Sequence, residues 1–141
     1  MAIRTRTAAA FVIVLLPVYP VGGALVRAAK PLTIQSFNRT DSTRLTYEIA
    51  QDRADHLPKW DPRTAPDPPL SFAGALKAAR AWQFPKFGTQ KVAEAGLYRN
   101  NPWNTWYYHI IFRANTVTPT VNVIVLLDGS VVEARVDKIK P

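Results

Sequence analysis

Residues 69–85 form the clearest periodic segment of the chain, because apolar residues recur there at intervals of three and four. The apolar stripe consists of Phe72, Ala75, Leu76, Ala79 and Trp82. Lys77, Arg80 and Gln83 fall away from it, Ser71 is a suitable N-cap residue, and Pro85 is expected to end the element. We predict an amphipathic helix whose apolar stripe covers a sheet.

After residue 90 the hydrophobic period changes to two, which is typical of half-buried strands. In residues 91–99, Ala93, Ala95 and Leu97 share one face. In residues 103–112, one face consists of Trp106, Tyr108, Ile110 and Phe112, and the other of Thr105, Tyr107, His109 and Ile111. We expect the first of these two faces to line the core. The second is exposed unless a partner or the N-terminal strands cover it.

Residues 121–136, VNVIVLLDGSVVEARV, predict a β-hairpin around Asp128-Gly129, the preferred composition of a two-residue type I′ turn. That turn would place four pairs on a mainly apolar face: Leu127 with Ser130, Val125 with Val132, Val123 with Ala134, and Val121 with Val136. The other face would pair Ile124 with Glu133 and Asn122 with Arg135. Because this register separates apolar from polar side chains, we predict one buried and one wet face.

Residues 30–50 contain two shorter alternating runs, with apolar residues at Leu32 and Ile34 and at Leu45, Tyr47 and Ile49. Residues 51–69 carry five prolines and four aspartates, which predicts an extended connector without helix or central strand. Trp60 is its one large apolar residue and is expected to pin it to the body. His56 is interpreted as a surface histidine.

These patterns together predict an α+β fold with one main helix packed on an antiparallel β-sheet of about four to five strands. The helix and sheet occupy residues 69–141. Residues 29–68 hold the N-terminal strands and the proline-rich connector, and whether residues 30–50 join the sheet is left open.

The first 28 residues have the order of a secretory signal peptide. Arg4 and Arg6 precede an apolar stretch from Ala8 to Val18, and small residues follow, with possible cleavage after Ala24 or Ala28. The alternative is an uncleaved anchor, because residues 8–26 are just long enough to span a membrane. Either reading predicts an extracytoplasmic location, with membrane attachment only through an uncleaved segment.

Composition limits the chemistry further. The chain of 141 residues is 48% hydrophobic, enough for one modest core, and it has no cysteine, which excludes disulfides and thiol nucleophiles. Cleavage after Ala28 would remove Arg4, Arg6 and Arg27 from 18 basic residues, leaving 15 against 10 acidic ones, a net charge of +5. These charges are interspersed, which favours a solvated surface over a nucleic-acid footprint.

Catalytic and metal-binding patterns are missing from the sequence. There are two histidines, no G-x-S-x-G, no H-E-x-x-H and no phosphate-binding glycine loop. We therefore predict a protein that is not an enzyme and has no catalytic residues, metal site or cofactor.

The helix PPLSFAGALKAARAW, the strand WYYHIIF and the hairpin VIVLLDGSVVEARV resemble, in this order, the PepSY-like group of small extracytoplasmic domains. The likeness covers about residues 69–137. The run before the turn is more apolar than the usual PepSY pattern, and no glutamate-rich strand is present. The resemblance implies a PepSY/cystatin-like helix on an antiparallel sheet and a binding or inhibitory role beside proteases or the cell wall.

Two functions remain as hypotheses. The first is an exported peptide- or protein-binding module that acts through an open sheet face or edge, with Tyr107, His109 and Ile111 as partner-binding residues. The second is a binder of cell-envelope polymer or another polyanion through basic and aromatic surface residues. The export signal argues against nucleic acid as the ligand.

Overall fold

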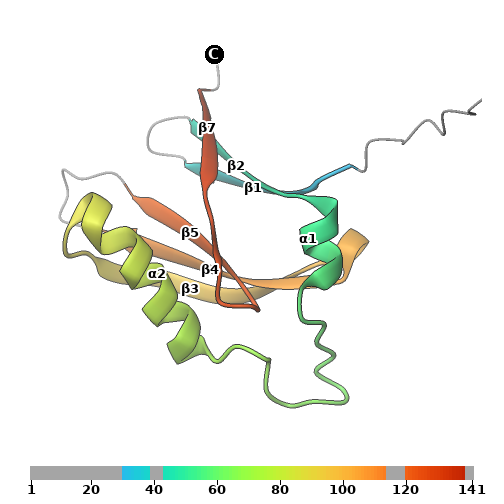
Figure 1. Ribbon diagram of the computed structural model, residues 1–141. Helices are drawn as coiled ribbons and strands as arrows, with labels where there is room; N and C mark the ends of the chain where they lie inside the picture. The colour runs from blue at the N-terminus through green and yellow to red at the C-terminus, as the bar shows by residue number, and fades with distance from the viewer. Residues whose placement is uncertain (1–29, 39–42, 114–119, 139–141) are drawn as a thin grey trace, which may run out of the picture.

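The computed structural model describes residues 30–38, 43–113 and 120–138, and shows an α+β fold with one main helix and two antiparallel sheets (Figure 1). The predicted signal peptide lies outside this described part. The elements in chain order are β1 (Leu32–Asn38), β2 (Thr43–Ile49), α1 (Gln51–His56), α2 (Phe72–Phe87), β3 (Lys91–Asn100), the 3-10 turn η1 (Asn101–Trp103), β4 (Thr105–Arg113), β5 (Val121–Leu126), β6 (Val131–Val132) and β7 (Ala134–Lys138).

Helix α2 begins where the sequence predicts, because the Ser71 side chain accepts a hydrogen bond from the Gly74 N–H at 3.1 Å. Its predicted end at Pro85 is wrong. Proline lies in the last turn, where it removes only one backbone donor, and the helix ends when the Gly88 N–H donates to the Phe84 carbonyl. Gln83 does not fall away from the core, since it is buried and donates to the Gly88 carbonyl at 2.6 Å.

A four-stranded sheet with the order β3-β4-β5-β6 lies under α2. Ala75 and Ala79 of the helix are fully buried, and their small side chains let the helix approach the strands. Tyr108, Ile110 and Phe112 are buried as predicted, and Trp106 is half-buried at the margin of the same core. The strand side of this core is completed by Val121, Val123, Val125 and Leu127.

Strand β3 carries a bulge between Val92 and Glu94 that the sequence pattern did not reveal. The bulge shifts the alternation by one residue, so that Val92 joins Ala95 and Leu97 against the helix-side core. Ala93, predicted on that face, is exposed.

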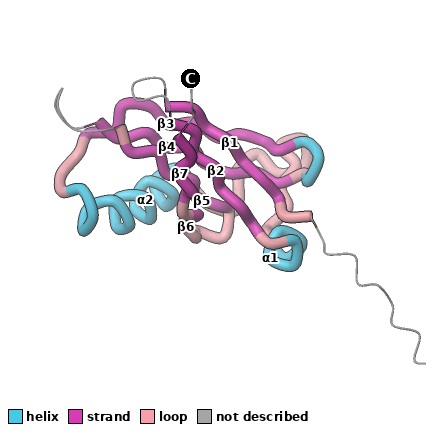
Figure 2. Tube along the Cα trace, turned by 90° about the horizontal axis from the view of Figure 1, so that it is seen from above, coloured by secondary structure: helices cyan, strands magenta, loops and turns pink. Residues whose placement is uncertain are grey.

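The expectation of one sheet is corrected by a second, three-stranded sheet with the order β1-β2-β7. It packs on the face of the four-stranded sheet opposite α2, and Figure 2 shows α2 and the β1–β2 pair on different sides of the central strands. Its core unites Leu32, Ile34, Tyr47, Ile49, Ile124, Leu126 and Val132. Residues 29–68 and 69–141 therefore share a sheet and a core.

The predicted hairpin register is wrong by one residue. Val132 pairs with Ile124 and Val131 with Val125, and the Leu126 N–H donates to the Ser130 carbonyl at 2.9 Å. The connection is a three-residue loop in which Gly129 alone has positive φ, 83°, rather than a type I′ turn. The prediction failed because it assumed one wet face, whereas both faces of β5 are buried.

The connector also differs from expectation at its start, where residues 51–56 form the short helix α1 with Ala54 buried. From Pro58 onward no helix or strand interrupts it before α2. Trp60 does pin it to the body, with its ring 4.7 Å from that of Trp106. His56 is exposed, and its Nδ1 lies 2.6 Å from the Asp52 carbonyl oxygen.

We predict that Phe112→Ala lowers the free energy of unfolding by about 3–5 kcal/mol, because it empties a fully buried ring position under α2. Urea unfolding followed by circular dichroism measures the change. A loss below about 1 kcal/mol would contradict the placement of Phe112 in the core.

Gly129→Val is expected to destabilise the fold by about 1–3 kcal/mol, because a β-branched residue is strained at a φ of 83°. The space around the Gly129 Cβ position is open, so the loss would come from the backbone alone. An unchanged melting temperature would show that the loop takes another conformation.

Candidate functional site

The chain leaves the hairpin immediately after β6, and this departure exposes an edge of the central sheet. Strand β6 pairs only with Ile124 and Val125. After Glu133 the chain turns away, and β7 pairs with β2 instead. Among the described residues, no strand pairs with residues 121–123 of β5 on the side away from β4. The predicted hairpin placed Ala134 and Val136 beside Val123 and Val121. In the structure, no strand occupies that position among the described residues.

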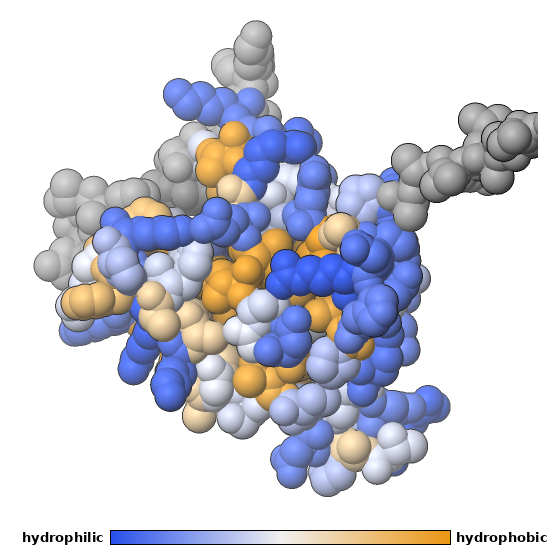
Figure 3. Space-filling model, viewed as in Figure 1, coloured by the Kyte–Doolittle hydropathy of each residue, from blue (hydrophilic) through white to orange (hydrophobic). Residues whose placement is uncertain are grey.

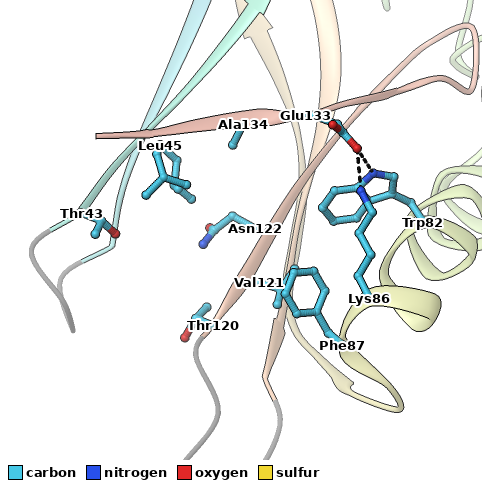
Figure 4. A pocket seen from close by; sticks show the side chains of 11 residues that line it. Thr43, Leu45, Trp82, Lys86, Phe87, Thr120, Val121, Asn122, Glu133 and Ala134 are labelled. Atoms are coloured by element: carbon cyan, nitrogen blue, oxygen red, sulfur yellow. Dashed lines mark hydrogen bonds and ion pairs between the residues drawn. The ribbon is translucent and has the colours of Figure 1, made fainter. Parts of the chain in front are cut away.

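A groove of about 350 Å³ lies beside this edge. Figure 4 shows its walls coming from three places: the C-terminal end of α2, the start of β5, and the β2–β7 pair. It is lined by Thr43, Leu45, Trp82, Lys86, Phe87, Thr120, Val121, Asn122, Glu133, Ala134 and Val136. The groove therefore lies where the two sheets and α2 diverge.

Apolar side chains dominate the groove. Leu45 and Val136 are directly paired across β2 and β7, and both line it. Val136 is 61% exposed and Phe87 is 44% exposed, and both line the same groove. In the space-filling view, apolar surface gathers in the middle of the face across which β7 runs (Figure 3). Contiguous exposed apolar surface of this kind marks interaction sites.

One ion pair closes the helix side of the groove. Lys86 Nζ donates to Glu133 Oε1 at 2.6 Å, and Trp82 Nε1 donates to the same oxygen at 3.2 Å (Figure 4). Lys86 Nζ also lies 4.1 Å from the centre of the Trp82 ring. The hydrogen bond from Lys86 lowers the pKa of Glu133, so this carboxylate stays ionised and matched at neutral pH. The groove consequently offers no unmatched charge from this pair.

A tyrosine of the other sheet occupies one of the two backbone hydrogen-bonding groups of Asn122 at the open edge of β5. The hydroxyl of buried Tyr47 donates to the Asn122 carbonyl at 3.1 Å, and burial raises the pKa of this phenol well above its ordinary value. Leu126 directs its N–H to the β6 side, so Asn122, four residues earlier, directs its backbone groups to the same side. The carbonyl is thus occupied, while the N–H of Asn122 faces the groove.

The predicted partner-binding residues lie elsewhere on β4. Tyr107, His109 and Ile111 are half-buried rather than open, and none of them lines the groove. Tyr107 packs at the margin of the second core, and its ring stacks on that of Tyr98 at 6.0 Å. His109 Nε2 lies 3.0 Å from the Asn122 side-chain oxygen.

A glycine makes room for this row of side chains. A Cβ at Gly96 would lie 2.7 Å from the Tyr98 ring, so only glycine lets that ring cover the strand beside His109. Burial, followed by the neighbouring Tyr98, raises the pKa of Tyr107. A role of these residues in partner binding stays a prediction.

Sequence reasoning missed the groove because its residues are far apart in the chain and meet only through the exchange of β7 between sheets. The one available signal was Glu133, a charged residue that interrupts the run from Val131 to Val136. In the described ranges there is no group of three or more potential metal ligands. No helix within those ranges is both long and apolar enough to cross a membrane.

Neither a protein-family model, nor a curated protein, nor a solved structure matches the chain significantly. The PepSY-like resemblance is thus neither supported nor opposed by these comparisons, and the site is interpreted from its geometry.

We predict that Tyr47→Phe lowers stability by about 0.5–1.5 kcal/mol, because the Asn122 carbonyl loses its donor. The substitution keeps the buried ring, so chemical unfolding isolates the effect of the hydroxyl. A neutral result would mean that this carbonyl is satisfied by water in the groove.

Proposed function

We propose that this protein is an exported, non-enzymatic binding module that holds an extended apolar segment of a protein or peptide along the edge of β5. The observation that carries the proposal is the open edge of residues 121–123 beside an apolar groove. An extended chain is the ligand that can use both features, because its backbone pairs with a strand edge and its side chains enter the flanking hollows.

The walls of the groove define the ligand further. Side chains alternate along a strand, so one set would point toward Trp82 and Phe87 of α2. The other set would point toward Leu45 and Val136. Both walls are apolar, and the Lys86–Glu133 pair is internally matched, which favours alternating uncharged side chains on the ligand.

The exposed edge is short, and this sets the size of the pairing region. Three residues of β5 span about 10 Å at about 3.3 Å per residue. Of these three residues, only Asn122 directs its backbone groups to the open side, and its carbonyl is occupied by Tyr47. The Asn122 N–H is thus the one backbone group of residues 121–123 left for the segment, and the apolar walls would supply most of the affinity. Such an arrangement suits reversible recognition of short segments rather than permanent assembly.

The extracytoplasmic location and the PepSY/cystatin-like assignment belong to this proposal. Support for the first comes from the signal-like order of residues 1–28, and for the second from a helix packed on an antiparallel sheet. An inhibitory role would follow if the bound segment belonged to a protease. Tyr107, His109 and Ile111 would then be a separate contact surface on the central sheet.

A charge placed in the groove tests the proposal. Peptides selected from a random linear library on the full chain should perturb the backbone amide NMR signals of residues 121–123. Val136→Glu should weaken their binding at least about tenfold, because it places an unmatched carboxylate against the apolar segment. Since Val136 is 61% exposed, the same change should alter stability by about 0.5 kcal/mol or less.

Phe84→Glu is the matched control, because Phe84 is also 61% exposed and does not line the groove. Its peptide affinity should equal that of the parent. Binding should also respond weakly to salt, unlike the binding of a polyanion. Selection of no peptides, or equal binding by both variants, would refute the proposed site.

A further inference from the structure

A second hollow, of about 470 Å³, lies where the connector crosses the end of the β3–β4 hairpin. Its lining residues are Trp60, Asp61, Pro62, Arg63, Arg99, Asn104 and Trp106, none of which lines the groove beside β5. It combines aromatic rings with charged and amide side chains, so its chemistry differs from that of the apolar groove.

Two indole rings form one wall of this hollow. The rings of Trp60 and Trp106 meet edge to face at 4.7 Å, and Trp60 Nε1 donates to the Ala65 carbonyl at 2.8 Å, which fixes its orientation. Trp106 Nε1 is buried and has no hydrogen-bond partner in the described part of the chain. Buried donors are seldom left without an acceptor.

The charges of the hollow do not cancel. Arg63 is matched by Asp61, with 2.7 Å between Nη2 and Oδ2, and these hydrogen bonds lower the pKa of Asp61 to about 2. The guanidinium of Arg99 donates through Nε and Nη2 to the side-chain oxygen of Asn104, at 3.0 and 2.8 Å. That acceptor is neutral, and Arg99 forms no ion pair with a carboxylate of the described residues, although its charge helps to lower the pKa of Asp61. One positive charge is thus left over.

Arg99 is held in place from two sides. Asn104 adopts a left-handed φ of 48° at the end of η1, and its amide there receives both Arg99 donors. The Arg99 guanidinium carbon lies 6.0 Å from the centre of the Trp106 ring. A guanidinium fixed beside an aromatic wall is suited to a planar anion, which it can bind through two parallel hydrogen bonds.

We propose that this hollow binds an acidic sugar, a ring that carries one carboxylate. The carboxylate would meet Arg99, and the ring would pack on the indoles of Trp60 and Trp106. The Asn104 side-chain NH2 group would donate to a ring hydroxyl oxygen, because the Asn104 side-chain oxygen already accepts from Arg99, and the ionised Asp61 would accept from a ring hydroxyl. Asp61 also disfavours a ligand with several adjacent charges, which separates this ligand class from a general polyanion.

NMR titration of the full chain with glucuronate, glucose and acetate tests the proposal, followed through the indole N–H signals of Trp60 and Trp106. Glucuronate should cause a saturable shift of both signals at millimolar concentration. Glucose, which lacks the carboxylate, and acetate, which lacks the ring, should each bind at least about tenfold more weakly.

Arg99→Gln should weaken glucuronate binding about tenfold and leave glucose binding unchanged. Arg80→Gln, which removes a charge from the exposed side of α2, should leave both unchanged. If Arg99→Gln does not fold, Arg99→Lys can replace it. Lysine keeps the positive charge but lacks the planar guanidinium that makes two parallel hydrogen bonds, so this change should also weaken glucuronate binding. Val136→Glu should not change glucuronate binding. The acidic-sugar proposal and the proposed peptide-binding function can therefore be refuted independently of each other.

Three results would overturn the proposal. The absence of a saturable shift with glucuronate would show that the hollow only anchors the connector. Equal affinity for glucuronate and acetate would show that the rings contribute nothing and that the site holds a free carboxylate. If Arg99→Gln and Arg80→Gln weakened glucuronate binding equally, the loss would reflect the net charge of the protein rather than a contact with Arg99.

Discussion

The pairing of β7 with β2 is the interaction on which the rest of the architecture depends. The two strands share five residue pairs, from Tyr47 opposite Ala134 to Thr43 opposite Lys138. Their outer face is held by Arg135, which contacts Glu48 at 3.0 Å and Asp137 at 3.4 Å. These exposed ion pairs contribute little energy and match the charges on the solvent side of the second sheet. By leaving the hairpin after two residues, the chain closes a second core and opens a sheet edge at the same time.

The apolar run of β5 follows from its position between two cores. Val121, Val123 and Val125 face α2, while Ile124 and Leu126 face the three-stranded sheet. A strand covered on both sides has no need of alternating polar residues. A domain without disulfides gains stability mainly from buried apolar area, and here one central sheet contributes both of its faces. Asn122 interrupts the pattern at the margin, where it carries the Tyr47 and His109 contacts and borders the groove.

Local patterns were sufficient for much of the fold. The Ser71 cap, the strands at residues 32–34 and 45–49, and the core side of β4 could all be predicted, because each depends on neighbours in the sequence. The helix stripe was right at Ala75, Leu76, Ala79 and Trp82 and wrong at Phe72, which is 48% exposed. The hairpin register and the exchange of β7 could not, because they depend on a second sheet that covers the supposed wet face. The groove was missed for the same reason. The predicted site at Tyr107, His109 and Ile111 assumed an open face, whereas these side chains are half-buried.

The most direct test of this account is the strand partner of Val136, which interstrand NMR contacts identify. If β7 belongs to the second sheet, the Val136 backbone protons will show contacts to Leu45, its partner on β2. The edge at residues 121–123 will then show no contact to β7, and the Asn122 amide will exchange rapidly with solvent. Contacts between Ala134 and Asn122, with a protected Asn122 amide, would mean that the hairpin continues in the register of its first two pairs. The second sheet would then lack its third strand, and the groove would not exist.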